Sequence, residues 1–153
     1  MFKDDMTIIL SADHAGFEMK EHIKSFLEDE GYKRIEDVGA TQFYPTDHYP
    51  RYMKDAADRL TKTPNAFGIL FGGSGQGEAI VANRYKGVRA IVYPAHNTEI
   101  VLLGRQHNDA NVLSIGARLV SNSEAEEAIR LFLTTPFSYE DRHERRVQQI
   151  DEG

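Results

Sequence analysis

The sequence alternates short apolar runs with segments of helical periodicity, and this alternation constrains the fold more than any other feature. The runs cover residues 7–10, 35–38, 67–71, 88–93 and 112–115. Most are apolar at successive positions, as is typical of strands buried on both faces of a parallel sheet. The pattern predicts one doubly wound, Rossmann-like α/β domain with helices on both faces of a five-stranded parallel sheet. Its site should lie at the carboxyl ends of the strands.

Helical segments fill the intervals between these runs. The expected helices extend from Phe17 to before Gly31, from Tyr49 onward, and over residues 78–84, 98–105 and 123–133. A glycine commonly follows the last turn of a helix, as Gly31 does here. Ser123 and Glu126 have the spacing of a capping box, so we expect them to begin the last of these helices.

A polar C-terminal helix is expected over residues 139–150, after Pro136. Its apolar stripe is thin and it carries several basic side chains, so it covers little of its own core. It either packs on a second subunit or forms a solvated tail. We treat residues 1–153 as a single domain, with 136–153 as a helical extension.

Composition excludes several classes of protein. The formal net charge is -6, which argues against a nucleic-acid partner. The chain has no cysteine, which rules out disulfides, thiolate nucleophiles and cysteine-ligated zinc. We see neither a secretory signal nor an apolar stretch of membrane-spanning length, so we expect a cytoplasmic protein.

The run Gly72–Gly77 contains four glycines among six residues, between an expected strand and an expected helix. Backbone N–H groups in such a loop can converge on an anion at the start of the helix. The run lacks the Gly-Lys-Ser/Thr ending of a P-loop and the third glycine of a dinucleotide-binding fingerprint. It is therefore either an anion hole or a tight turn that allows close packing.

Glu78 follows this loop, in the first turn of the expected helix. The helix dipole would lower the pKa of its carboxyl group, whereas burial would raise it. A carboxylate beside an oxyanion hole is the arrangement that moves a proton on a carbon next to a carbonyl. The alternative is a favourable contact between the charge and the helix dipole.

Further polar side chains gather after the first strand and before the fifth. Asp13-His14 should lie at the same edge of the sheet as the glycine-rich loop. The alternative to a role in the site is that Asp13 only caps a helix and His14 is incidental. The turn at residues 107–111 is rich in Asn and Asp, which leaves His107 unexplained. No close metal-ligand spacing accompanies these histidines, so we predict no metal site.

Arg142 and Arg146 lie four residues apart on one face of the C-terminal helix. Arginines placed in this way can bind a phosphate through paired hydrogen bonds. The alternative is ordinary solvated surface charge.

Taken together, these segments resemble the type B ribose-5-phosphate isomerases, a family that includes the galactose-6-phosphate isomerase subunits. The resemblance extends from Ile8 to about Ile150 and rests on residues 11–17, on 72–78 with Asn83, on 107–113 with 116–118, and on 142–146. It implies reversible aldose–ketose isomerisation of a phosphorylated sugar through an enediolate, as in the pentose phosphate pathway, without metal or organic cofactor.

The same resemblance implies roles for residues of the glycine-rich loop. Many family members have a cysteine base at the position of Gly72, whereas another branch uses a glutamate at the position of Glu78. This sequence matches the second branch, which makes Glu78 the base. Ser74 and the loop amides would stabilise the enediolate oxygen; the loop residues concerned are Gly73, Ser74, Gly75, Gln76 and Gly77.

Roles for the remaining residues follow in the same way. His107 would assist ring opening, with Asn108 nearby, and Asp13 would hold sugar hydroxyls. The phosphate would be bound by His14, Arg118, Arg142 and Arg146. The resemblance also implies a homodimer, or a dimer of dimers, with sites shared between subunits. One departure is His48, where the family usually has an aspartate.

Two other functions stay open at this point. Isomerisation of a six-carbon sugar phosphate, such as allose or galactose 6-phosphate, would use the same chemistry. A non-catalytic phosphosugar-binding subunit would bind without turnover, although such a subunit needs no carboxylate at Glu78.

Overall fold

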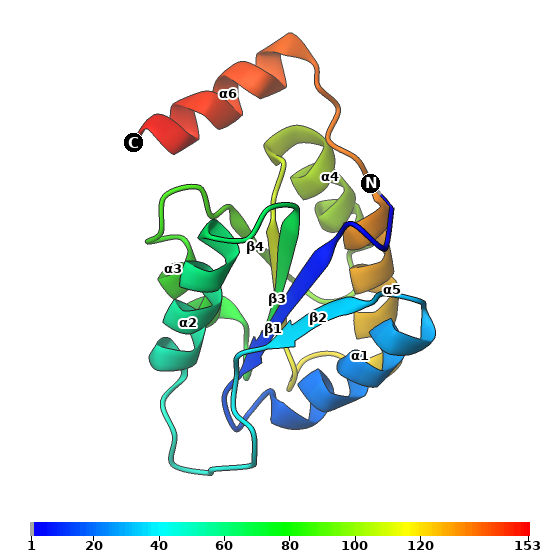
Figure 1. The fold of residues 1–153 in the computed structure, drawn as a ribbon, viewed down its shortest axis with the longest axis vertical. Helices are drawn as coiled ribbons and strands as arrows, with labels where there is room; N and C mark the ends of the chain where they lie inside the picture. The colour runs from blue at the N-terminus through cyan, green and yellow to red at the C-terminus, as the bar shows by residue number, and fades with distance from the viewer. Residues whose placement is uncertain (1) are drawn as a thin grey trace.

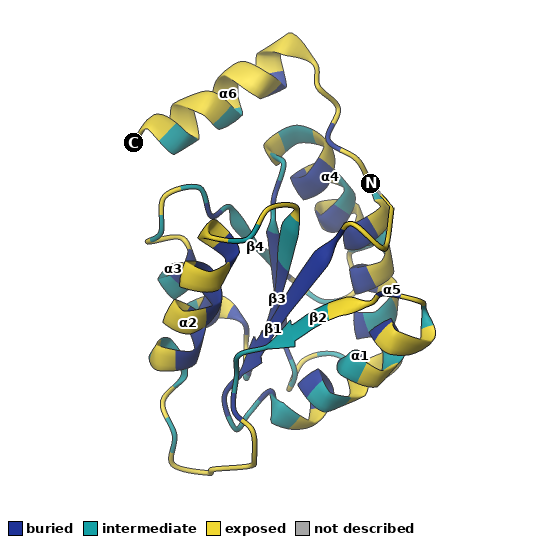
Figure 2. Cartoon of the chain, in the orientation of Figure 1, coloured by how far each residue is buried: buried dark blue, intermediate teal, exposed yellow. Residues whose placement is uncertain are grey.

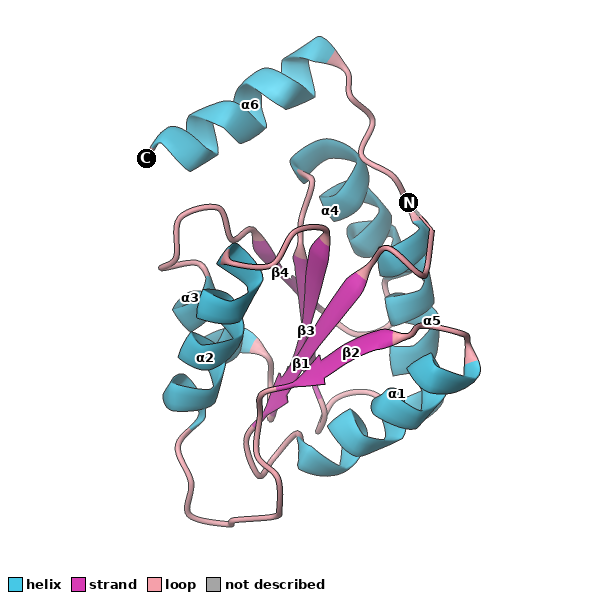
Figure 3. Cartoon of the chain, viewed as in Figure 1, coloured by secondary structure: helices cyan, strands magenta, loops and turns pink. Residues whose placement is uncertain are grey.

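A computed structural model describes residues 2–153 and contains five strands in one parallel sheet. The strands are β1 (Thr7–Ala12), β2 (Arg34–Asp37), β3 (Ala66–Gly72), β4 (Ala90–Tyr93) and β5 (Val112–Gly116). Their order across the sheet is β2-β1-β3-β5-β4, and every neighbouring pair is parallel (Figure 3). The expected doubly wound α/β fold is confirmed.

Helices cover both faces of this sheet, as Figure 1 shows. The helices within residues 2–153 are α1 (Phe17–Asp29), α2 (Tyr49–Thr61), α3 (Gln76–Ala82), α4 (Thr98–Asn108), α5 (Asn122–Thr134) and α6 (Asp141–Glu152). Side chains of α1, α4 and α5 pack with Ile8 and Leu10 in one core layer. Side chains of α2 and α3 pack with Ile9 in the other. Successive residues of β1 therefore face opposite layers, which explains its unbroken apolar run.

The predicted boundaries of the helices and strands agree with the structure within a few residues. The prediction that Ser123 and Glu126 cap α5 is wrong. The helix begins at Asn122, and Ser121 is its N-cap: the Ser121 hydroxyl accepts a hydrogen bond from the amide N–H of Glu124 at 3.1 Å. Ser123 lies within the first turn. Ser121 and Glu124 have the same three-residue spacing as Ser123 and Glu126, so the motif occurs twice and spacing alone cannot choose between them.

The C-terminal helix α6 extends past the end of the sheet at which the strands begin, beside α4 (Figure 1). Most of its residues are exposed and only His143 is buried, as Figure 2 shows. The expectation that this helix covers little of its own core is confirmed. No helix within residues 2–153 combines the length and apolar character needed to cross a membrane.

Candidate active site

Three loops meet at the carboxyl ends of the central strands β1, β3 and β5. Asp13 comes directly after β1, and Gly72 and Gly116 end β3 and β5. The amide of Ala117 donates to the carbonyl of Gly72 at 2.8 Å, and the Ser114 hydroxyl donates to the carbonyl of Gly75 at 2.6 Å. These bonds tie the glycine-rich loop to the end of β5, so its form is set by the sheet.

The glycine-rich loop leads from β3 into α3 in a conformation that few side chains permit. Gly75 has a φ of 82°, in the left-handed region that glycine adopts without steric cost. A Cβ atom on Gly77 would overlap the hydroxyl group of Tyr49. Ser74 and Gln76 are exposed in this loop, and the Ser74 hydroxyl accepts a hydrogen bond from the Gln76 amide at 3.3 Å. The loop therefore presents backbone and one hydroxyl to a ligand.

The carboxyl group of Glu78 lies against the Cα atom of Gly72. A Cβ atom on Gly72 would overlap the Oε1 and Cδ atoms of Glu78. No side chain at position 72 can coexist with Glu78 in this position. A cysteine at 72 and a glutamate carboxyl group from position 78 would thus compete for the same space.

Glu78 is 4% exposed, although it is in the first turn of α3. Burial raises the pKa of its carboxyl group, and the negative charge of Asp13 raises it further, while a backbone hydrogen bond opposes the shift. Of the two opposing effects that the sequence suggested, burial outweighs the helix terminus. A buried carboxyl group with a raised pKa is a candidate for a catalytic acid or base.

Asp13 lies near this carboxyl group, and Arg118 lies over the glycine-rich loop. Asp13 is buried, and its Oδ1 atom accepts hydrogen bonds from the amides of Ala15 and Gly16 at 3.0 and 3.3 Å. It stabilises the turn before α1 while it contributes charge beside Glu78. Arg118 is exposed, and its guanidinium group lies over Gly73, 3.1 Å from the place of a Cβ atom there. An anion at the loop would meet a cation at this position.

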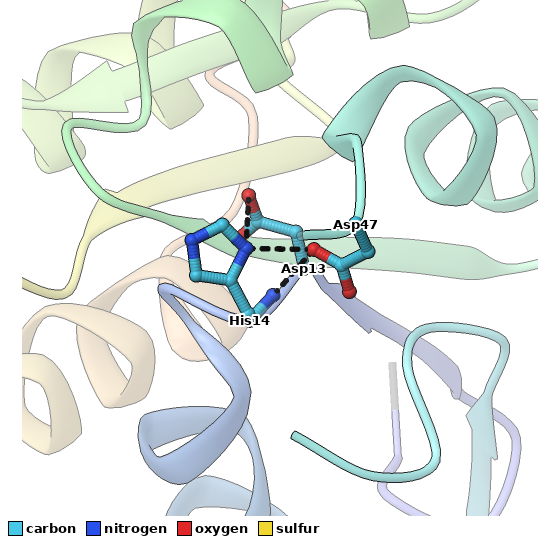
Figure 4. A group of neighbouring side chains, drawn as sticks. All are labelled: Asp13, His14 and Asp47. Carbon is cyan, nitrogen blue, oxygen red and sulfur yellow. Dashed lines mark hydrogen bonds and ion pairs between the residues drawn. The ribbon is translucent and has the colours of Figure 1, made fainter. Parts of the chain in front are cut away.

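His14 is held by Asp47, a residue that the sequence analysis missed (Figure 4). The Nδ1 atom of His14 lies 2.7 Å from the Oδ1 atom of Asp47 and 3.9 Å from the Oδ2 atom of Asp13. His48, the departure noted in the sequence, is exposed, and Asp47 beside it supplies the carboxylate. Asp47 follows an irregular loop after β2, and no periodic pattern in the sequence marks its contact with His14.

Asp13, His14 and Asp47 place three possible metal-ligating atoms within 4.8 Å of one another. Oδ1 of Asp47 and Oδ1 of Asp13 already accept hydrogen bonds from His14 and from backbone amides. Hydrogen bonding accounts for the cluster, and the expectation that the protein has no metal site stays a prediction.

The other predicted site residues lie at the opposite edge of the sheet, where the strands begin. Helix α4 leads from β4 back to that edge, so His107 and Asn108 at its end lie far from the carboxyl ends of the strands. Ser138, just before α6, donates through its amide to the carbonyl of Gln106 at 3.0 Å. Arg142 and Arg146 on α6 thus belong to this second group and do not meet Glu78 within one chain.

The histidines of the second group pack on one another. The rings of His107 and His143 lie 4.3 Å apart, and Nδ1 of His143 is 2.7 Å from the Ser138 hydroxyl. Burial lowers the pKa of His143, and the nearby His107 lowers it further. Arg142 is exposed and lies 3.5 Å from Glu140, and Arg146 is also exposed.

Asn83 is one of the residues on which the family resemblance rests, and its side chain holds two elements of the fold together. Its side chain donates to the carbonyl of Ala90 at 3.0 Å and accepts from the Ala90 amide at 2.7 Å. It joins the end of α3 to the first residue of β4, so this motif residue supports the frame of the site.

A parallel α/β sheet with a buried carboxyl group beside a glycine-rich loop at its carboxyl edge is an arrangement suited to sugar isomerases. The chain belongs to the Ribose/Galactose Isomerase family, whose model matches residues 8–150. Within that family it groups with the type B ribose-5-phosphate isomerases. Ribose-5-phosphate isomerase B of Mycolicibacterium paratuberculosis is 40% identical over 147 residues, which cover 96% of this chain and 91% of the relative.

Solved structures agree with this assignment. A ribose 5-phosphate isomerase from Thermotoga maritima matches with a TM-score of 0.88 and 38% identity, over 97% of this chain and 99% of that one. Ribose-5-phosphate isomerase B from Mycoplasma genitalium with bound ribulose-5-phosphate matches with a TM-score of 0.90 and 31% identity, over 97% and 96% of the two chains. The expected family and fold are confirmed.

Proposed function

We propose that this protein interconverts ribose 5-phosphate and ribulose 5-phosphate through an enediolate, with Glu78 as the base. The observation that carries the proposal is the buried Glu78 carboxyl group, which has a raised pKa and fills the space beside Gly72 next to the glycine-rich loop. The relative from Mycoplasma genitalium, which has bound ribulose-5-phosphate, supports the choice of substrate.

In this proposal Glu78 first removes the proton from C2 of the open-chain aldose. The electron pair of the broken C–H bond forms the C1–C2 double bond, and negative charge develops on O1. The Ser74 hydroxyl and the amides of the glycine-rich loop stabilise that oxygen. The proton of the C2 hydroxyl passes to O1, the C2–O2 carbonyl forms, and Glu78 returns its proton to C1, which yields the ketose with the base regenerated. A raised pKa suits this work, because the same group must take and release a proton near neutral pH.

Ring opening and phosphate binding are assigned to side chains from both edges of the sheet. His107 assists ring opening with Asn108 nearby, and Asp13 holds sugar hydroxyls. His14 and Arg118 bind the phosphate together with Arg142 and Arg146. A cytoplasmic location and independence of metal or organic cofactors belong to the same proposal.

A second copy of the chain is required to complete such a site. Glu78 and His107 lie at opposite edges of one sheet, so His107, Asn108, Arg142 and Arg146 reach the site from the partner of a homodimer. The exposed helix α6 supports this arrangement, because it makes few contacts with its own core.

Mixing two inactive variants tests the shared site. In a dimer of one Glu78→Gln chain and one His107→Asn chain, one site carries both substitutions and the other carries neither. Random pairing should therefore restore about a quarter of the parent activity. Mixtures as inactive as the separate variants would place both residues in one chain's site.

Substrate choice is tested with ribose 5-phosphate, allose 6-phosphate and galactose 6-phosphate, read by product formation. We expect turnover of ribose 5-phosphate. Activity confined to the six-carbon substrates would replace the pentose assignment. Binding without turnover of any of them would support the non-catalytic subunit.

A further inference from the structure

One carboxylate oxygen of Asp47 holds His14 at two points. The Oδ1 atom accepts the backbone N–H of His14 at 3.1 Å and lies 2.7 Å from its Nδ1 atom. The Asp47 side chain is 6% exposed, so water competes little for these bonds. Both the backbone and the ring of His14 are therefore oriented by a residue from a different segment of the chain.

Asp47 is held in its charged form. Burial by itself would raise the pKa of Asp47, but the hydrogen bonds from the ring and the backbone of His14 leave this pKa below its usual value. A carboxylate only accepts hydrogen bonds, so the His14 Nδ1 atom must carry the hydrogen. The second ring nitrogen, Nε2, then points away from both carboxylates, as Figure 4 shows.

We propose that Asp47 is a positioning residue for His14: it fixes the ring, keeps a proton on Nδ1 and leaves Nε2 to donate to the substrate phosphate. The inference rests on the proposed function, which assigns phosphate binding to His14. In the charged imidazolium both ring nitrogens are donors, so Nε2–H can meet a phosphate oxygen while Nδ1–H remains on Asp47.

Two acids and one aromatic ring surround His14. Asp13 faces the ring from the turn before α1, and Asp47 faces it from the loop before α2, where the Phe43 ring also lies at 6.1 Å. The Oδ2 atom of Asp47 is buried without a hydrogen-bond partner among residues 2–153. Over the same residues, neither carboxylate has a lysine or arginine within ion-pair distance. His14 is therefore the basic side chain that pairs with both acids.

The first test is the Asp47→Asn substitution, which keeps the shape and removes the charge. We expect KM for ribose 5-phosphate to rise about five- to tenfold, with kcat changed less than about twofold, on the scale of one charge-assisted contact. Glu126→Gln is the matched control, because it breaks the exposed pair of Glu126 with His22 and should change neither value.

Testing Asp47→Asn in a variant that already lacks His14 separates a positioning role of Asp47 from a purely structural one. If Asp47 acts through His14, then Asp47→Asn should add little to the KM of a His14→Asn variant. Equal effects of Asp47→Asn with and without His14 would overturn the proposal, as would an unchanged KM in the properly folded single variant.

The ring of His14 gives a readout that is independent of activity. Nitrogen NMR at alkaline pH should find neutral His14 protonated at Nδ1 in the parent and shifted toward Nε2–H in Asp47→Ala. An unchanged tautomer in Asp47→Ala would contradict the role of Asp47. If the tautomer shifts in Asp47→Ala but His14→Asn leaves KM unchanged, then His14 does not bind the phosphate. In that case Asp47 still sets the tautomer of His14.

Discussion

At the carboxyl edge of the sheet Glu78 and Asp13 are buried, whereas at the amino edge Arg142 and Arg146 are exposed on α6. The first group is fixed by the ends of β1 and β3 and by hydrogen bonds among three loops. The second is carried by a helix that touches little of the chain. Burial perturbs the pKa of a carboxyl group and prepares it for proton transfer, while exposure leaves arginines fully hydrated until a ligand or subunit covers them.

This difference separates two kinds of effect. Changes to the buried Glu78 or to Gly72 beside it should act on the chemical step and lower kcat. Changes to the exposed arginines of α6 should act on binding of the phosphate and raise KM. The following experiments test that separation, from the largest expected effect to the smallest.

Removing the base should have the largest effect. Glu78→Gln keeps the size of the side chain but cannot accept a proton, so kcat should fall about 100-fold or more, the scale of a general base. Binding of ribulose 5-phosphate, followed by calorimetry, should change little. Unchanged turnover would assign the base to another residue.

A methyl group on Gly72 should lower kcat by a similar factor while the Glu78 carboxyl group itself stays unaltered. In Gly72→Ala the new Cβ atom displaces the Glu78 carboxyl group, and a shift of about 1 Å can cost about 100-fold in rate. The double variant Gly72→Ala/Glu78→Gln should be little worse than Glu78→Gln alone. Full additivity of the two losses in kcat would show that Gly72 acts independently of Glu78.

At the amino edge, Arg146→Ala should raise KM for ribose 5-phosphate by about 10- to 150-fold, corresponding to a charge-assisted contact of about 1.5–3 kcal/mol. Steady-state kinetics should find kcat much less affected. Arg130→Ala is a suitable control, since Arg130 is an exposed arginine that pairs with Glu30. Equal KM values for the parent and Arg146→Ala would make Arg146 surface charge only.

The raised pKa of Glu78 also predicts how stability depends on pH. The folded chain binds this proton more tightly than the unfolded chain, so the contribution to stability is present below the unfolded pKa and is lost as pH rises through the folded pKa. Glu78→Gln should therefore raise the melting temperature relative to the parent at pH 8, with a smaller difference at pH 4. A melting difference that is independent of pH would contradict the assignment of a raised pKa.

The smallest effect concerns the helix that follows β5 at the carboxyl edge. Ser121→Ala removes the observed N-cap of α5 and should lower the free energy of unfolding by about 1 kcal/mol. Ser123→Ala, at the other serine of the repeated motif, should change it by less than about 0.5 kcal/mol. Denaturant unfolding of the two variants decides between them, and the reverse order would restore Ser123 as the cap.

The sequence by itself determined the fold class, because unbroken apolar strands and helical spacing between them are local patterns. It also marked Glu78, Gly72–Gly77 and Asp13-His14 as one group, since parallel strands bring their carboxyl ends to one edge. The sequence did not determine the start of a helix where a capping motif occurs twice, as it does at Ser121 and Ser123. These features depend on neighbours in the chain or on the regular geometry of the sheet.

Only the tertiary structure decided the properties that depend on contacts between distant segments. The raised pKa of Glu78 arises from its burial, and its carboxyl group packs against Gly72 because the chain turns between β3 and α3. Asp47 reaches His14 across 33 positions of sequence through an irregular loop. The separation of His107 and Arg146 from Glu78 likewise follows from where α4 and α6 run. Such contacts depend on packing in three dimensions, which neither periodicity nor spacing along the chain specifies.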